Sequence, residues 1–159
     1  MEHDLLSELL DQLLDQERRL QLTSFDHDDA WALGQQMVTA ARAADLPVTI
    51  SVRRGRQRLF HAALAGTSAD NDDWIERKSR VVDHFGHSSY YVGTLFRSRG
   101  TTFEGSTTLD PRTHAAHGGV FPVIIAGVGP VGTVGVSGLP QADDHAFVVQ
   151  QLQIFLATP

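Results

Sequence analysis

Hydrophobic and polar residues repeat along this chain with two different periods. In several stretches apolar residues recur every three or four positions, which is typical of amphipathic helices. In residues 47–53 they alternate strictly with polar residues, which is typical of a half-buried strand. The pattern predicts helices over 3–20, 27–45, 70–85, 88–99 and from 140 onward, and strands over 47–53, 58–63, 120–126 and 131–137.

Glycine-containing turns join the predicted strands in pairs. Gly55 separates the first two strands, and residues 127–130 separate the last two. Two hairpins imply antiparallel pairing, with no strand–helix–strand alternation of the parallel kind. We therefore expect one α+β domain over 1–159, with a small antiparallel sheet made of two hairpins and flanking helices. Pro122 lacks a backbone donor, which favours a strand start or sheet edge.

The first helix, within residues 1–20, carries a wide stripe of leucines in three pairs, at 5–6, 9–10 and 13–14. Two outcomes are open for this stripe. It packs on its own domain, or it packs on another subunit, because a terminal leucine stripe is a ready oligomer contact.

Lys78 occupies an unusual place on the helix predicted over 70–85. On a helical wheel it falls in the middle of an apolar arc. The arc is formed by Trp74, Ile75, Val81, Val82 and Phe85. A buried lysine has a lowered pKa and serves as a base, a Schiff-base former or an anion hook. The alternative is a structural ion pair, or a stem that reaches past its neighbours to water.

Histidines and serines supply further candidate chemistry. His114 and His117 have the spacing of a metal-binding pair, with Asp143, Asp144 or His145 as a candidate third ligand. The alternative is that each histidine caps a helix or bonds a loop carbonyl. His87 precedes Ser88 and Ser89, which suggests a nucleophile beside a base, although helix capping explains these serines better.

Three glycines, Gly132, Gly135 and Gly138, interrupt the last predicted strand. Glycine inside a strand marks a bulge or a close approach by another backbone or a ligand. The hairpin that contains them is therefore a candidate wall of a binding site.

Composition narrows the function classes. A net charge of −6 argues against general binding to nucleic acid or anionic membranes. The basic run at 53–58 sits at a turn, where a solvated hairpin tip is expected and an anion-binding patch is the alternative. The absence of cysteine excludes disulfides and thiolate sites. No apolar run is long enough to span a bilayer and no secretory leader is visible, so a cytoplasmic location is expected.

Several motifs together resemble one known family. They are Asn71-Asp72-Asp73-Trp74, Arg77-Lys78-x-Arg80-Val81-Val82, His87-Ser88-Ser89-Tyr90-Tyr91-x-Gly93, Ala115-Ala116-His117-Gly118-Gly119 and Val136-Ser137-Gly138-Leu139-Pro140. Over residues 16–157 the chain resembles the GlcG/HbpS-like superfamily, also called the haem-degrading domain, in a branch catalogued only as an uncharacterised protein family. The resemblance implies a profilin- or PAS-like α+β domain, a homo-oligomer and, for some relatives, binding of haem or another tetrapyrrole. It supplies no catalytic residues.

Three functional hypotheses follow. The first is a small-ligand-binding homo-oligomer whose pocket lies between the central helices and the glycine-rich hairpin, with haem as one candidate ligand. The second is an enzyme with an acid–base or metal-assisted site on Lys78 and the histidines, and the third is an assembly or adaptor protein. The candidate ligand-binding residues are Trp74, Lys78, His87, Ser88, Tyr91, His117 and Ser137, and a divalent metal is a further candidate at His114 and His117.

Overall fold

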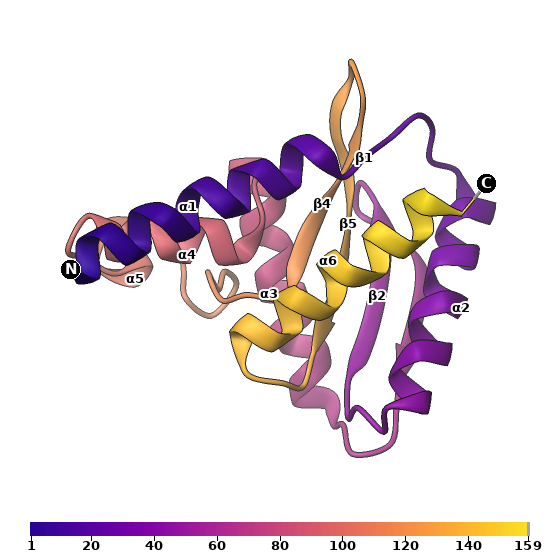
Figure 1. Cartoon of the computed structure of the whole chain (residues 1–159). Coiled ribbons are helices and arrows are strands. Elements are labelled where there is room, and N and C mark those ends of the chain that lie inside the picture. Colours follow the sequence, from indigo (N-terminus) through magenta and orange to yellow (C-terminus); the bar gives the residue numbers. More distant parts are fainter. Residues whose placement is uncertain (159) are drawn as a thin grey trace.

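The computed structural model describes residues 1–158, in which helices cover both faces of a mixed sheet (Figure 1). The helices are α1 (Glu2–Arg19), α2 (His27–Ala43), α3 (Ala69–Phe85), α4 (Ser89–Ser98), α5 (Phe103–Ser106) and α6 (Gln141–Ala157). The strands are β1 (Gln21–Leu22), β2 (Thr49–Arg54), β3 (Gln57–Ala63), β4 (Val120–Ile125) and β5 (Gly129–Ser137), in the sheet order β1-β4-β5-β2-β3.

Both predicted hairpins are present, and antiparallel pairing of β2 with β5 joins them into one sheet. The expectation of a purely antiparallel sheet was wrong, because β1 pairs in parallel with β4. Two residues are too few to show an alternating pattern, so the sequence gives no signal for β1. Because β1 reaches only Ile124 and Ile125, Pro122 lies in a part of β4 with no neighbour on that side, as its missing N–H requires.

Local sequence signals set the ends of the central helices. Gly86 ends α3 in the left-handed conformation, with φ 73°, where a residue without Cβ pays no steric cost. Ser88 caps α4 by accepting a hydrogen bond from the backbone of Tyr91, 3.1 Å away. The predicted capping role of Ser88 is therefore confirmed.

The two faces of the sheet differ in character. Ile50 and Val52 of β2, with Val48 just before the strand, lie in the main apolar core, which α2 and α6 close. The opposite face carries Thr49, Ser51, Arg53, Thr133 and Ser137, all buried, and lies under α3. We call these five residues the polar sheet face. The hydroxyls of Thr49 and Ser51 have no hydrogen-bond partner within residues 1–158.

Arg53 corrects the expectation that the whole basic run is a solvated tip. Its side chain is only 5% exposed and donates to Asp83 on α3, 3.1 Å away. Arg54 donates to the carbonyl of Phe25, whereas Gly55 and Arg56 do form an exposed turn. Strand alternation places Arg53 on the polar sheet face, where a carboxylate of α3 compensates its charge.

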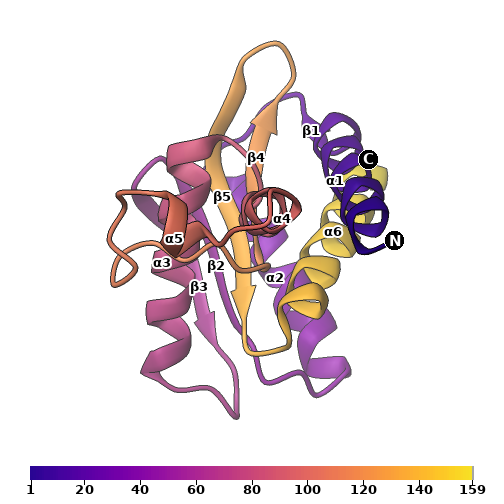
Figure 2. The same cartoon turned by 90° about the vertical axis from the view of Figure 1, so that its left-hand side faces the viewer.

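The leucine-striped helix α1 lies against α4 and extends past the sheet (Figures 1 and 2). Leu13, near its C-terminal end, is buried, whereas Leu5 is 63% exposed. Packing on its own domain is thus observed for one half of the helix, and the contact with another subunit stays a prediction. None of the helices within residues 1–158 has the length and apolar character needed to cross a membrane.

Candidate ligand-binding pocket

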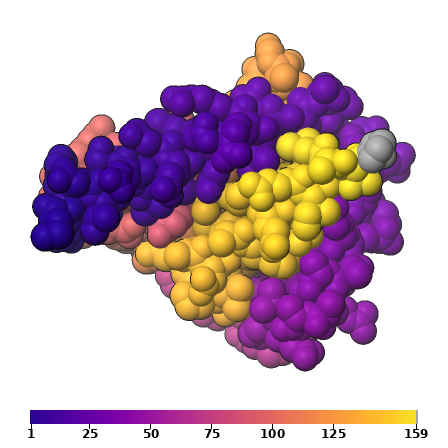
Figure 3. Space-filling model, in the orientation of Figure 1, coloured from indigo at the N-terminus to yellow at the C-terminus, as the bar shows by residue number. Residues whose placement is uncertain are grey.

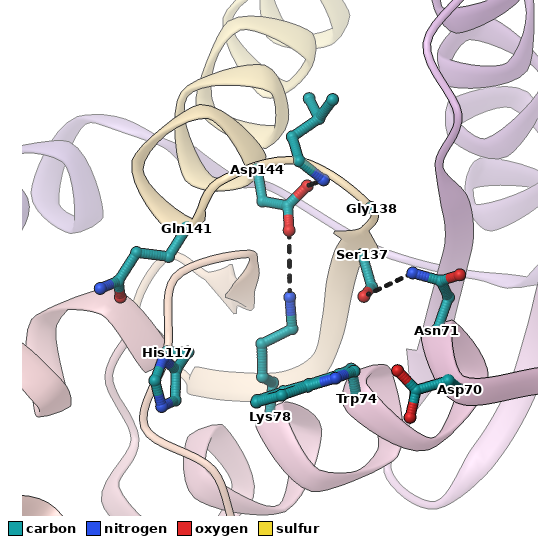
Figure 4. A pocket seen from close by; sticks show the side chains of 10 residues that line it. Asp70, Asn71, Trp74, Lys78, His117, Ser137, Gly138, Gln141 and Asp144 are labelled. Carbon is teal, nitrogen blue, oxygen red and sulfur yellow. Dashed lines mark hydrogen bonds and ion pairs between the residues drawn. The ribbon is translucent and has the colours of Figure 1, made fainter. Parts of the chain in front are cut away.

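A pocket of about 290 Å³ opens where the N-terminal half of α3, the end of β5 and the start of α6 meet (Figure 4). Four of the seven predicted ligand-binding residues line it: Trp74, Lys78, His117 and Ser137. The remaining lining residues are Asp70, Asn71, Gly138, Leu139, Gln141 and Asp144.

Lys78 forms the floor of this pocket and is 2% exposed. Its Nζ donates to the carbonyls of Val136, at 2.8 Å, and Gly118, at 3.1 Å, and to Asp144 Oδ2, at 3.5 Å. An ammonium has three hydrogens, so each has a protein acceptor. Burial lowers the pKa of Lys78, and the nearby Asp144 carboxylate opposes this shift. Lys78 therefore ties α3 to the loop before β4, to β5 and to α6.

Asp144 completes this buried ion pair from the first turn of α6. It is 3% exposed, and its Oδ1 accepts a hydrogen bond from the backbone N–H of Leu139 at 3.0 Å. Burial raises the pKa of Asp144, while Lys78 and the backbone N–H groups counteract that rise. Sequence analysis named Asp144 only as one of three candidate metal ligands. The adjacent Asp143 fits the same pattern, so the sequence could not identify the partner of Lys78.

The loop that carries His117 fits tightly against the ion pair. Gly119 has φ 138°, and a Cβ at this position would overlap Lys78 Nζ and the carbonyl of Val136. A Cβ at Gly93 of α4 would likewise overlap the carbonyl of Ala116. Gly93 and Gly119, the last residues of two of the family motifs, are therefore required because other atoms lie too close to leave room for a Cβ.

The wall of the pocket is formed by groups with unused hydrogen-bonding capacity. The ring of His117 packs edge-on against Trp74 with 5.3 Å between centroids. Burial lowers the pKa of His117, which favours the neutral imidazole. Ser137 Oγ accepts from Asn71 at 3.4 Å and keeps its own proton free for a ligand. The Oε1 of Gln141 accepts from the N–H of Gly118 at 3.0 Å, which leaves the amide NH₂ free.

Arg77 positions this wall, and sequence reasoning gave it no role. Its guanidinium lies 4.3 Å from the centre of the Trp74 ring and donates to the carbonyl of Pro111 at 3.2 Å. Its own carbonyl accepts from the N–H of Ala115 at 3.1 Å. Arg77 therefore fixes both Trp74 and the loop that leads to His117.

The other three predicted ligand residues, His87, Ser88 and Tyr91, do not line the pocket. His87 Nδ1 lies 2.7 Å from Glu17 Oε1 of α1, and its ring packs on Tyr91. These residues follow the C-terminal end of α3, whereas the pocket is built on its N-terminal half. A helix of 17 residues, at about 1.5 Å per residue, separates the two ends.

The two histidines of the predicted metal-binding pair, His114 and His117, do not lie in one site. His117 lines the pocket, whereas His114 Nδ1 contacts the hydroxyl of Thr113 at 2.8 Å and does not. The segment between the two histidines is not helical, so their spacing places them on no common face. Within residues 1–158 no group of three or more His, Asp or Glu side chains is placed to hold a metal ion.

A pH-dependent contribution to stability is predicted at His87. The Glu17 carboxylate raises the pKa of His87, so the pair stabilises the fold below the unfolded value of 6.5 and loses that effect as pH rises through the folded pKa. Because the His87 side chain is 41% exposed, we expect less than about 1 kcal/mol. Unfolding free energies of the wild type and Glu17→Gln between pH 5.5 and 8.5 measure the effect. A difference that does not change with pH would contradict the assignment.

Sequence comparison relates the chain to proteins of one family. The family model described as haem degrading protein HbpS-like matches residues 25–153. A UPF0303 protein of Streptomyces avermitilis is 58% identical over 144 residues, covering 91% of this chain and 88% of that protein. A UPF0303 protein of Serratia proteamaculans is 42% identical over 147 residues, with coverage of 92% and 91%.

Solved structures confirm the predicted α+β fold. The Ybr137w protein superposes with a TM-score of 0.85 at 32% identity and covers 93% of this chain and 87% of its own. A double mutant of HbpS from Streptomyces reticuli gives 0.65 at 19% identity, with coverage of 84% and 88%. A PduOC:Heme complex gives 0.68 at 15% identity, with coverage of 83% and 94%. At such low identities the last two show the fold alone.

Proposed function

The chain belongs to the HbpS-like family of haem-degrading proteins, and from this premise we propose that it binds a small polar molecule in the Lys78–Asp144 pocket. One observation carries the proposal: the floor of the pocket is saturated with internal hydrogen bonds, whereas the groups around it are not. A fixed floor with convergent free donors and acceptors is the usual construction of a ligand site.

Haem does not fit this pocket. The macrocycle needs an apolar slot and an axial ligand. The lining offers Trp74 and Leu139 as its large apolar side chains, and the remainder is mostly polar or charged. The volume of about 290 Å³ lies at the lower limit for drug-sized ligands, which are smaller than haem. His117 is a possible axial donor but already packs edge-on against Trp74.

A haemin titration followed in the Soret band is therefore expected to show no saturable binding at the pocket. We expect this because the pocket is lined mostly by polar side chains and is too small for the haem macrocycle. His117→Ala serves as the matched variant, and its titration is expected to superimpose on that of the wild type. A saturable Soret change in the wild type that the His117→Ala substitution removes would contradict the prediction.

Binding of a small molecule is tested by native mass spectrometry of the freshly purified protein. We expect a retained mass increment that is lost on unfolding and in Ser137→Ala, which removes the hydroxyl and adds no atom to the pocket. Thr133→Val is the matched control, because Thr133 lies on the same sheet face but outside the pocket lining. A protein without any retained mass, or an increment equally present in Ser137→Ala, would count against the site.

An acid–base role for Lys78 receives less support. A general base must present a free lone pair to its substrate. Lys78 Nζ is enclosed by three protein acceptors and is shielded from solvent. The geometry favours a structural role for the amine and a binding role for the groups around it.

Self-association is the second part of the proposal. The supporting observation is Leu5 of α1, which is 63% exposed. The N-terminal part of α1 lies at one end of the molecule (Figure 3). We expect Leu5→Glu to lower the mass measured by light scattering after size-exclusion chromatography. Ser7→Glu adds the same charge at an exposed polar position and serves as the control. A wild-type monomer, or an unchanged mass in Leu5→Glu, would contradict this part.

A further inference from the structure

The geometry points to the chemical class of the ligand: we propose a compact organic ammonium compound that also carries a hydrogen-bond acceptor. This inference rests on the proposed function and concerns the same pocket.

The charge balance of the pocket leaves one carboxylate over. Lys78 and Asp144 contact each other, and their sum is zero whether both are ionised or both are neutral. Burial lowers the pKa of His117, as do the nearby cations Lys78 and Arg77, and this favours the neutral imidazole. Asp70 remains, and its carboxylate has no ion-pair partner within the described residues. Among the lining residues, the charge without an ion-pair partner is therefore the Asp70 carboxylate, which attracts a cation. Arg77, Arg80 and Arg112 belong to the neighbouring groove, which Asp70 also lines.

The position of Asp70 suits a ligand cation. It lies in the first turn of α3, where the helix N-terminus stabilises negative charge. It faces the same pocket as Trp74, whose ring also contacts the Arg77 guanidinium. A ligand ammonium beside Asp70 would thus be paired on one side and pack on an aromatic residue on the other.

The donors for the second ligand group lie across the pocket from Asp70. In Figure 4, Gln141 and His117 are on one side of Lys78, and Asp70, Asn71 and Ser137 are on the other. The Gln141 amide NH₂ is free because its Oε1 is occupied by Gly118. A carbonyl or hydroxyl oxygen at the far end of the ligand would accept from this NH₂.

The shape of the site limits the distance between the two ligand groups. The pocket of about 290 Å³ lies at the lower limit for drug-sized ligands. An ammonium at Asp70 and an acceptor at Gln141 must therefore belong to one short molecule, such as an amino amide. The lining offers no unpaired cation to a ligand carboxylate, so a simple acid is disfavoured.

Four probes of equal heavy-atom count test charge selection: L-alaninamide, L-alanine, L-lactamide and L-lactate. Binding is followed by ¹H–¹⁵N NMR of the two tryptophan indole groups in the full chain. Trp74 lines the pocket, and Trp31 lies in a separate groove on α2 and serves as internal reference. We expect L-alaninamide to shift the Trp74 signal saturably with a Kd at least about 10-fold below that of L-lactate, equivalent to about 1.4 kcal/mol.

Asp70→Asn isolates the contribution of the carboxylate. In this variant the preference for L-alaninamide over L-lactate is expected to fall below about 2-fold, equivalent to about 0.4 kcal/mol. Asp73→Asn, an exposed acid one helical turn away and outside this pocket, is expected to retain the wild-type preference.

The outcomes separate this inference from the proposed function. A Trp74 shift that is strongest with L-lactate would overturn the ligand class while leaving the pocket as a binding site. Equal loss of preference in Asp70→Asn and Asp73→Asn would also overturn it, because a general surface charge would then be responsible. If none of the four probes shifts the Trp74 indole signal, the proposed ligand class is overturned as well. Only if native mass spectrometry also shows no retained small molecule does the proposed function fall with it.

Discussion

Replacing Lys78 by methionine is expected to lower the free energy of unfolding by about 3–5 kcal/mol at pH 8, the usual result of removing one partner of a buried ion pair. Methionine fills a similar volume, so the loss does not come from a cavity. It comes from Asp144, which stays buried without its counter-charge, and from the carbonyls of Gly118 and Val136, which lose their donor. Chemical denaturation measures the change.

The loss in Lys78→Met should depend on pH in a defined direction. Burial already raises the pKa of Asp144 above its usual 3.8, and removal of Lys78 takes away a group that opposed this rise. The folded variant therefore binds a proton that the unfolded chain has released. Its stability falls as pH rises from the unfolded pKa through the folded pKa. The variant should thus be less impaired at pH 5 than at pH 8.

The double variant Lys78→Met/Asp144→Asn is the control for this explanation. An asparagine at position 144 is neutral and can still accept the hydrogen bond from the Leu139 N–H. We expect it to recover at least half of the lost stability at pH 8 and to remove the pH dependence. A double variant as unstable as the sum of the two single variants would show that the pair is not coupled.

Gly119→Ala is the second substitution with a large expected effect, about 3 kcal/mol or more of lost stability. The backbone at this residue has φ 138°, which an L side chain rarely adopts. The added methyl group would also overlap Lys78 Nζ and the carbonyl of Val136, so the ion pair and β5 would both have to shift. Thermal and chemical denaturation measure the loss, and the Trp74 indole signal reports the pocket.

Gly127→Ala is matched to Gly119→Ala and separates the two causes. Gly127 also has a positive φ, 78°, but a Cβ there meets no atom within 4 Å. Gly127→Ala should lower the free energy of unfolding only because alanine disfavours a positive φ, by about 1 kcal/mol. Equal losses in the two variants would mean that contact with the ion pair contributes nothing.

The helices and hairpins of this fold were predictable because each has a local cause. Gly86 and Ser88 mark the break between α3 and α4, and the alternation in β2 is strict. What escaped prediction is non-local. The strand β1 exists only because β4 lies beside it, and the burial of Arg53 depends on Asp83 from another element.

The same distinction applies to the site. The wheel position of Lys78 predicted its burial. The pocket was expected between the central helices and the glycine-rich hairpin, but no residue of α4 lines it, and α6 does. Asp144, the partner of Lys78, is 66 residues away, and no local pattern distinguishes it from Asp143. The spacing of His114 and His117 carries no such information, because the non-helical segment between them directs the two side chains to different surroundings.

The polar sheet face has a consequence for the dynamics of the fold. The side of the sheet that packs on α2 and α6 buries valine, isoleucine and leucine, whereas the side under α3 buries hydroxyls, two of them without a partner in residues 1–158. Separation of α3 from the sheet should therefore cost less free energy than global unfolding. Amide hydrogens of α3 are then expected to exchange with deuterium before those at the centre of β2.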